Sequence, residues 1–151
     1  MPVPIHLDNF FYKKLNIEWI DGAQNDETPY QIKFSFDLKN KKDDPNHILL
    51  IFGVKVFPSE NFQGVSVDTI IEGFFSVNET IEEEKRAFYS MVNSASILYG
   101  IFRGQINLFT TCFPEGKILL PTVMMQDEIK NYFSQITSTT GKRKTKKTSS
   151  K

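Results

Sequence analysis

The side chains that most often catalyse reactions or bind metals are few in this sequence. Its only histidines are His6 and His47, and two predicted strands separate them in the chain. A zinc site needs three or four ligands held together, and no such set is grouped around either histidine. The sequence therefore predicts no metal site, and we expect His47 to be a turn residue.

Nucleophiles and acid–base pairs give no stronger signal. Cys112 is the only cysteine, so it cannot form an internal disulfide, which is typical of a reducing compartment. Without a nearby histidine we expect it to be a small buried residue, not a nucleophile. The paired carboxylates at 43–44 and 82–84 lie in charged runs, where nothing raises their pKa for acid catalysis. The sequence predicts no enzyme and no cofactor, although an enzyme binding a small ligand between sheet and helix stays open as an alternative.

Regular spacing appears instead in four predicted strands. Residues 30–38 alternate strictly between apolar and polar, which indicates a strand with one buried face. A first strand at 11–19 places Phe11, Leu15, Ile17 and Trp19 on one face together with Lys13. A third at 47–57 is apolar on both faces and needs cover on both, and a fourth runs from Val65 to Val77. The segment 39–46 predicts a long charged hairpin tip.

After Val77 the apolar spacing changes to that of helices. Thr80 and Glu83 have the spacing of a capping box, which places a helix start near residue 80. Apolar residues then recur at helical spacing to Phe109, with an interruption at 93–96 that predicts two helices or one broken helix. A link containing Pro114 and Pro121 precedes a short last helix at 126–135. The chain is thus sheet first and helices second.

Charge divides the chain into two parts. Six of the 18 Lys and Arg residues lie after Gly141, which leaves 12 basic against 18 acidic groups in residues 1–141, a net charge of −6. We expect a folded domain at 1–140 and a disordered basic tail at 141–151. A nucleic-acid or ribosome-associated protein that makes nonspecific contacts through this tail is a rival hypothesis. No apolar run approaches the ~20 residues that span a bilayer, and no signal peptide is visible, so we expect a cytoplasmic protein.

Three stretches resemble a known family. They are E-G-F-F-S-V at 72–77, N-S-A-S-I-L-Y-G-I-F-R-G-Q-I at 93–106 and I-L-L-P-T-V-M-M-Q-D-E-I at 118–129. In order and spacing they resemble SecB, the bacterial export chaperone, over roughly residues 11–135. The resemblance implies an α+β fold, with a four-stranded antiparallel sheet and helices packed on one face, assembling as a dimer of dimers in the bacterial cytoplasm.

The resemblance also implies a function. SecB proteins hold unfolded preproteins along apolar grooves and deliver them to the translocase motor SecA, and the 14 Phe residues suit such contacts. The candidate residues of the client grooves are Phe11, Trp19, Phe52, Phe57, Phe62, Ile97, Leu98 and Leu119. The candidate residues for SecA docking are Glu18 and Asp68.

Three departures from the SecB pattern concern partners. The third acidic docking position falls on Lys14, the loop at 20–29 lacks an aromatic residue before its proline, and the C-terminus is basic. The loop departure lowers one wall of the client groove, whereas Lys14 and the basic C-terminus weaken SecA docking, and together the departures indicate a divergent member. Such SecB-like chaperones can serve one dedicated client, for example an antitoxin, instead of general export.

Overall fold

The computed structural model describes residues 5–24, 30–78, 83–114, 118 and 120–145. Its elements are β1 (Ile5–Ile20), β2 (Gln31–Lys41), β3 (Asp44–Phe57), β4 (Gly64–Val77), α1 (Glu83–Phe109), a 3-10 turn (Thr110–Cys112) and α2 (Met125–Thr145). The four strands form one antiparallel sheet in the order β1-β4-β3-β2. This confirms the α+β class with a four-stranded antiparallel sheet.

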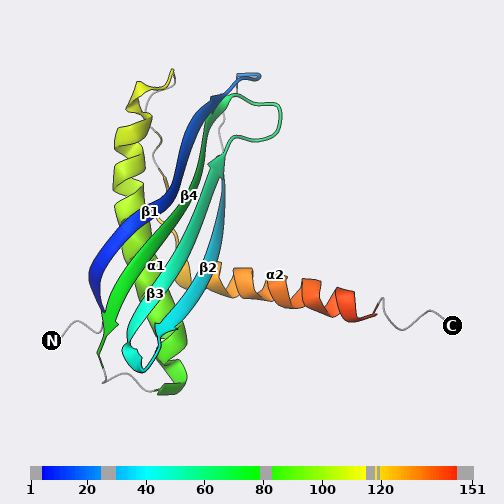
Figure 1. Cartoon of the computed structure of the whole chain (residues 1–151). Helices are drawn as coiled ribbons and strands as arrows, with labels where there is room; N and C mark the ends of the chain where they lie inside the picture. Colours follow the sequence, from blue (N-terminus) through cyan, green and yellow to red (C-terminus); the bar gives the residue numbers. More distant parts are fainter. Residues whose placement is uncertain (1–4, 25–29, 79–82, 115–117, 119, 146–151) are drawn as a thin grey trace.

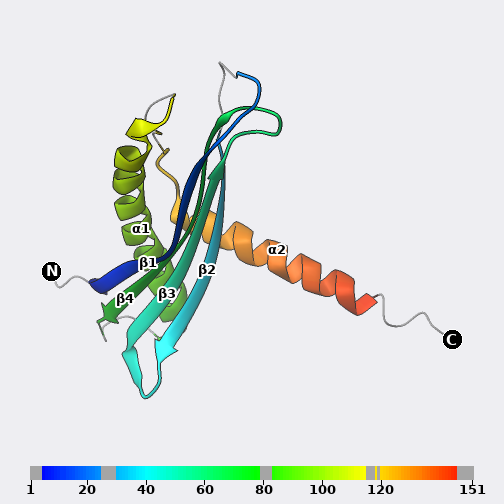
Figure 2. The same ribbon diagram turned by 45° about the horizontal axis from the view of Figure 1, so that its top comes forward.

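Both helices lie on the same side of the sheet (Figure 1). α1 runs along the length of the sheet, and α2 crosses behind it and extends past the β2 edge, as the rotated view also shows (Figure 2). We call the side of the sheet that packs against the helices the inner face and the opposite side the outer face. No helix among the described residues is long and apolar enough to cross a membrane.

The core lies between the inner face and the helices. Alternate residues of β3 and β4 point into it, because successive side chains of a strand take opposite faces. The fully buried large side chains are Leu50, Phe52, Val54, Val56, Val65, Val67, Ile71, Phe75, Leu98, Phe102, Ile106 and Ile129. The prediction that β3 is a central, largely buried strand is confirmed by its position between β2 and β4.

β1 differs from its prediction in length and in phase. It begins at Ile5, and its pairing with β4 shifts once between Leu7 and Asn9 and again between Tyr12 and Lys14. Each shift adds one residue to β1, as in a β-bulge. The expectation that Phe11 shares a face with Leu15, Ile17 and Trp19 was wrong: Phe11 pairs with Glu72 on the outer face, and Tyr12 takes the inner face.

α1 is one unbroken helix of 27 residues, so the prediction of a break at 93–96 was wrong. The hydroxyl groups of Ser94 and Ser96 donate hydrogen bonds to the carbonyls of Ser90 and Val92 in the preceding turn, at 2.6 and 2.7 Å. Serine bonded in this way is compatible with a continuous helix. Ala95 between them is fully buried, so this segment packs against the core. The predicted cap at Thr80 lies outside the described residues.

The hairpin between β2 and β3 is tighter than predicted. The strands extend to Lys41 and from Asp44, which leaves a two-residue turn in which Asp43 has a φ of 68°. Aspartate tolerates this left-handed conformation. His47 is consequently a residue of β3 and not of the turn, and its ring nitrogen lies 2.6 Å from an oxygen of Asp44.

α2 is also longer than the predicted helix at 126–135. It continues to Thr145 and so includes the first residues of the basic segment, whereas 146–151 lie outside the described residues. The division into a domain at 1–140 and a disordered tail stays a prediction.

Candidate functional site

An apolar groove lies where α1 and α2 meet. Its lining residues, which define what we call the α1–α2 groove, are Phe88, Ile129, Lys130, Phe133, Ser134 and Thr137. The groove is shallow and open to solvent, with a volume of about 830 Å³. Phe88 and Phe133 are 39% and 42% exposed, which is a large exposure for phenylalanine in a soluble domain. This groove therefore offers aromatic surface to a partner.

A series of aromatic contacts connects the groove to the core. Phe52 and Phe36 have ring centroids 5.5 Å apart, Phe36 meets Tyr132 edge-on at 5.5 Å, and Tyr132 meets Phe133 edge-on at 5.3 Å. Edge-to-face pairs of this kind add to the packing energy. The first turns of α2 are thereby fixed against β2, and Phe133 is held at the surface.

The polar groups of the groove are few. The Lys130 ammonium lies 5.9 Å from the centroid of the Phe88 ring, within cation–π range. The Ser134 and Thr137 hydroxyls donate to carbonyls of their own helix, at 2.9 Å each. These hydroxyls are already satisfied, so the groove can bind a partner mainly through apolar contact.

The link between the helices is held in place by side chains of α1 and of the 3-10 turn that follows it. The Tyr99 hydroxyl donates to the Pro121 carbonyl at 2.6 Å, and the Arg103 Nε donates to the Leu120 carbonyl at 2.8 Å. Buried Thr110 accepts a bond from the Ile118 amide at 2.8 Å and donates one to the Ile106 carbonyl at 2.7 Å. These bonds determine where α2 begins and thus position one wall of the groove.

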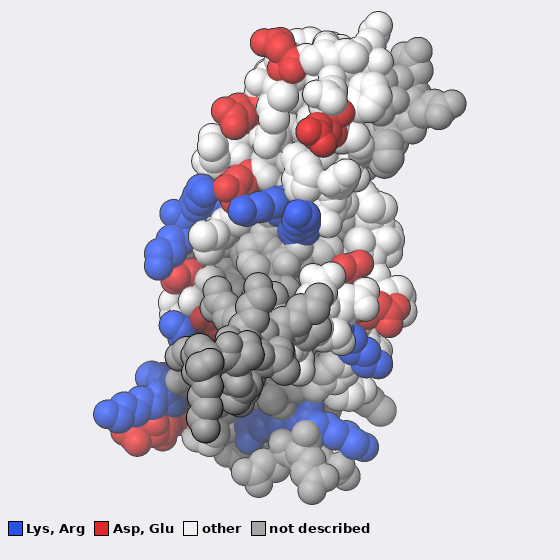
Figure 3. All heavy atoms as spheres, turned by 90° about the vertical axis from the view of Figure 1, so that its right-hand side faces the viewer, with Lys and Arg blue, Asp and Glu red and all other residues white. Residues whose placement is uncertain are grey.

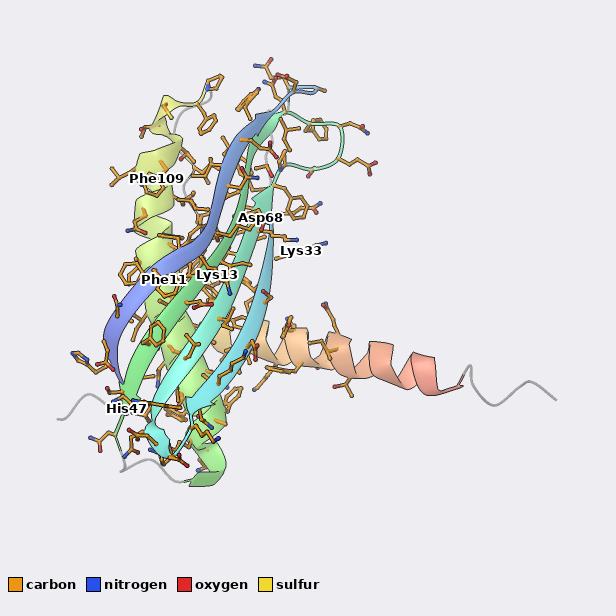
Figure 4. The ribbon with its side chains drawn as sticks, viewed as in Figure 1. Phe11, Lys13, Lys33, His47, Asp68 and Phe109 are labelled. Atoms are coloured by element: carbon orange, nitrogen blue, oxygen red, sulfur yellow. The ribbon has the colours of Figure 1, made fainter. Side chains whose placement is uncertain are left out.

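A second apolar area lies on the outer face of the sheet. The rings of Phe11 on β1 and Phe74 on β4 have centroids 6.0 Å apart, and both side chains are exposed. Glu72, nearly buried beside Phe11, pairs with Lys13 at 3.4 Å. Figure 4 shows Phe11 and Lys13 near each other on β1.

The residues predicted to dock SecA also lie on the outer face. Asp68 of β4 is opposite Asn16 of β1, and Glu18 lies two residues further along β1, so the two carboxylates are close neighbours on the face. Lys14, however, reaches Asp68 with an Nζ to Oδ2 distance of 2.7 Å. Asp68 is thus already paired with a cation within the chain.

The predicted client-binding residues do not form one surface. Phe52 and Leu98 have no exposed area, because they belong to the core. Phe11 is on the outer face, Trp19 and Ile97 are half-buried on the helix side, and Phe57 and Phe62 are half-buried in or after β3. Leu119 lies outside the described residues. The structure thus removes Phe52 and Leu98 from the candidate surface and adds residues that sequence reasoning missed.

One of the missed residues has a sequence signal. Successive side chains of a strand take opposite faces, so Phe74, which precedes buried Phe75 in β4, must be turned away from the core. Helices give no such signal, because α1 buries both Leu98 and Tyr99. Phe88 and Phe133 therefore had to be found from the structure.

Among the described residues, few titratable groups have a shifted pKa. Burial raises the pKa of Tyr12 to about 12, and its hydroxyl donates to Gln105. A hydrogen bond from Ser76 lowers the pKa of Asp8. Cys112 is exposed, contrary to our expectation, because it ends the 3-10 turn at the surface. Among the described residues no group of His, Cys, Asp and Glu could hold a metal ion.

Comparison with known proteins shows the fold. No family model and no curated protein matches the chain. Among solved structures, the SecB-like chaperone Rv1957 of Mycobacterium tuberculosis, bound to a ChAD peptide of the Rv1956 HigA1 antitoxin, superposes with a TM-score of 0.62 and 10% identity over 80% of this chain and 91% of that one. The chain has a SecB-like fold. A protein of unknown function from Streptococcus agalactiae is also similar, with a TM-score of 0.50 and 14% identity over 78% of this chain and 97% of that one.

Proposed function

We propose that this protein is a molecular chaperone, not an enzyme, that holds unfolded polypeptides. The observation that carries the proposal is the exposed α1–α2 groove on a SecB-like fold. Phe88 and Phe133 line it at the surface, and its hydroxyls are bonded within the helix. Contact through dispersion and desolvation is indifferent to the partner's sequence, which suits a partner that is unfolded.

Two kinds of client fit such a surface, preproteins destined for export or one dedicated polypeptide such as an antitoxin. The bond between Lys14 and Asp68 favours the dedicated client, because a SecA element that is positively charged would have to displace Lys14. The similar chaperone Rv1957 was solved with an antitoxin peptide. Delivery to SecA in the bacterial cytoplasm is therefore the weaker form of the proposal.

We further propose that the chain forms a homo-oligomer, with a tetramer as the expected state. Large apolar side chains stay exposed at several places outside the groove. They are Phe11, Leu15, Ile20, Phe74, Tyr89, Leu108, Phe109, Met124 and Ile136. Burial of apolar surface contributes roughly 25 cal/mol per Å², so association that covers even part of this set is favoured.

The proposal is tested by mixing the protein with a chemically unfolded client and following light scattering. A holdase suppresses aggregation at near-stoichiometric ratios, at high as well as at low salt, because its contacts are apolar. Light scattering coupled to gel filtration gives the oligomeric state in the same buffer. A monomer without effect on aggregation would refute the proposal. Retention of RNA at low salt, lost when residues 141–151 are deleted, would support the nucleic-acid rival.

A further inference from the structure

The outer face of the sheet carries a row of charged residues across all four strands. The strand register places Lys33 of β2 opposite Lys55 of β3, Lys55 opposite Asp68 of β4, and Asp68 opposite Asn16 of β1. Asp68 pairs with Lys14 at 2.7 Å. Within the described residues no salt bridge involves Lys33 or Lys55. Among the described residues, the row therefore keeps two exposed positive charges without a salt-bridge partner.

This arrangement is unfavourable for the isolated chain. Like charges directly opposite each other on neighbouring strands repel, and Lys33 and Lys55 are such a pair. The Lys33 ammonium lies 5.5 Å from the centroid of the Phe57 ring, which holds it over the outer face. Figure 3, which faces the β2 edge, shows Lys and Arg side chains at several places over the middle and lower part of the molecule, interspersed with acidic ones, while the charged residues of the uppermost part in this view are acidic.

A hollow of about 400 Å³ lies directly beside the row. Its walls include Lys14, Lys55 and Asp68, and its floor is formed by Ser35, Gly53 and Ile70. Gly53 and Ser35 are paired across β3 and β2, and a β-carbon on Gly53 would collide with the Ser35 hydroxyl. The hollow exists because glycine leaves this position of the outer face without a side chain.

We propose that this surface, defined by Lys33, Lys55, Ser35, Gly53 and Ile70, is a docking site for an acidic polypeptide segment. Carboxylates of the partner pair with the two lysines and the Ser35 hydroxyl, and an apolar side chain beside them enters the hollow against Ile70. The site is separate from the α1–α2 groove, because the groove lies on the helix side of the sheet, and it does not depend on the proposed holdase function.

A polypeptide fits the surface better than a nucleic acid does. Three carboxylates lie on the same outer face: Asp68 directly opposite Lys55, and Asp37 and Glu72 four residues further along their strands. A phosphate chain that follows the face would meet these carboxylates, and residues 1–141 as a whole carry a net charge of −6. Two carboxylates of a peptide, in contrast, match two lysines without extending over the acidic residues.

The experiment measures binding of a short fluorescent peptide with glutamates on both sides of one leucine. A matched peptide with glutamine in place of every glutamate is the first control. We expect the acidic peptide to bind full-length protein, and to bind at least about tenfold more weakly at high salt, where exposed charge pairs are screened. Equal binding of both peptides, or the absence of binding, would overturn the proposal.

Variants locate the site. Lys33→Glu combined with Lys55→Glu should weaken binding of the acidic peptide at least about tenfold, since each exposed pair contributes modestly and each substitution also introduces repulsion. Lys41→Glu combined with Lys42→Glu makes the same charge change at the hairpin tip and should leave binding within about twofold. Gly53→Ala reduces the hollow without changing the charge. It should weaken binding of the leucine peptide more than binding of a peptide in which serine replaces the leucine. Circular dichroism and thermal melting verify that each variant is folded.

The outcomes separate this site from the holdase. Suppression of client aggregation should be unchanged in the Lys33→Glu and Lys55→Glu variant. If the Lys41→Glu and Lys42→Glu variant lost as much peptide affinity as the Lys33→Glu and Lys55→Glu variant, net charge and not this surface would attract the peptide, and the proposal would be overturned. Single-stranded RNA is tested as a competitor. If RNA bound at the same two lysines more strongly than the peptide does, the partner would be a nucleic acid and the proposal would be overturned.

Discussion

Phe133 provides a quantitative test of the α1–α2 groove. A phenylalanine side chain contributes roughly 200 Å² of surface, and Phe133 is 42% exposed, so about 80 Å² is available to a client. At roughly 25 cal/mol per Å², covering that area contributes about 2 kcal/mol. Phe133→Ala should therefore weaken the affinity for an unfolded client by about 30-fold. Alanine is the best helix former, so α2 itself should be preserved.

The matched control is Phe109→Ala. Phe109 has the same residue type and the same exposed fraction, 42%, but is the last residue of α1 and does not line the groove. Its replacement should change client affinity by less than about threefold. Affinity is measured by fluorescence anisotropy of a labelled unfolded client, with the oligomeric state checked for both variants. Equal losses from the two variants would refute a defined groove and indicate binding to exposed apolar surface in general.

Three further predictions concern stability and titration. Thr110→Val leaves a buried amide of the link without its acceptor and should cost about 1–3 kcal/mol in denaturant unfolding, whereas exposed Thr111→Val should cost less than about 0.5 kcal/mol. Ser76→Ala should raise the pKa of Asp8 towards its ordinary value in an NMR titration, because the Ser76 hydroxyl donates to the carboxylate at 2.5 Å; an unchanged pKa would contradict this. Tyr12 has a folded-state pKa raised to about 12, so its contribution to stability should be complete below pH ~10 and lost as the pH rises towards 12; Tyr12→Phe should remove that part of the alkaline loss.

The strands and helices were largely predictable because their periodicity is a local property. Residues 30–38 alternate without interruption, and β2 covers nearly the same residues. The breaks were less predictable. The serines at 94 and 96 indicated an interruption, but their hydroxyls bond to the preceding turn and the helix continues. Whether a serine caps, breaks or continues a helix depends on its surroundings, which the sequence pattern does not contain.

The functional surface was less predictable than the fold. Phe52 and Leu98 were candidates because they are large and apolar, yet both are in the core. Residue type alone does not separate a core side chain from a binding one. The pairing of Lys14 with Asp68 likewise needed the register of β1 and β4, since 54 positions separate the two residues in the chain.

The two bulges of β1 have a consequence for how this strand could vary. Asp8 and Lys13 are the extra residues, and the second shift restores the phase that the first one changed. In residues 9–12 the even-numbered side chains therefore face inward, whereas in the rest of β1 the odd-numbered ones do. Substitutions at positions 9 and 11 would remodel the outer face alone, while Phe10 and Tyr12 keep the contacts with the core. Two compensating one-residue bulges therefore exchange the faces of four residues and leave the alternation in the rest of β1 unchanged.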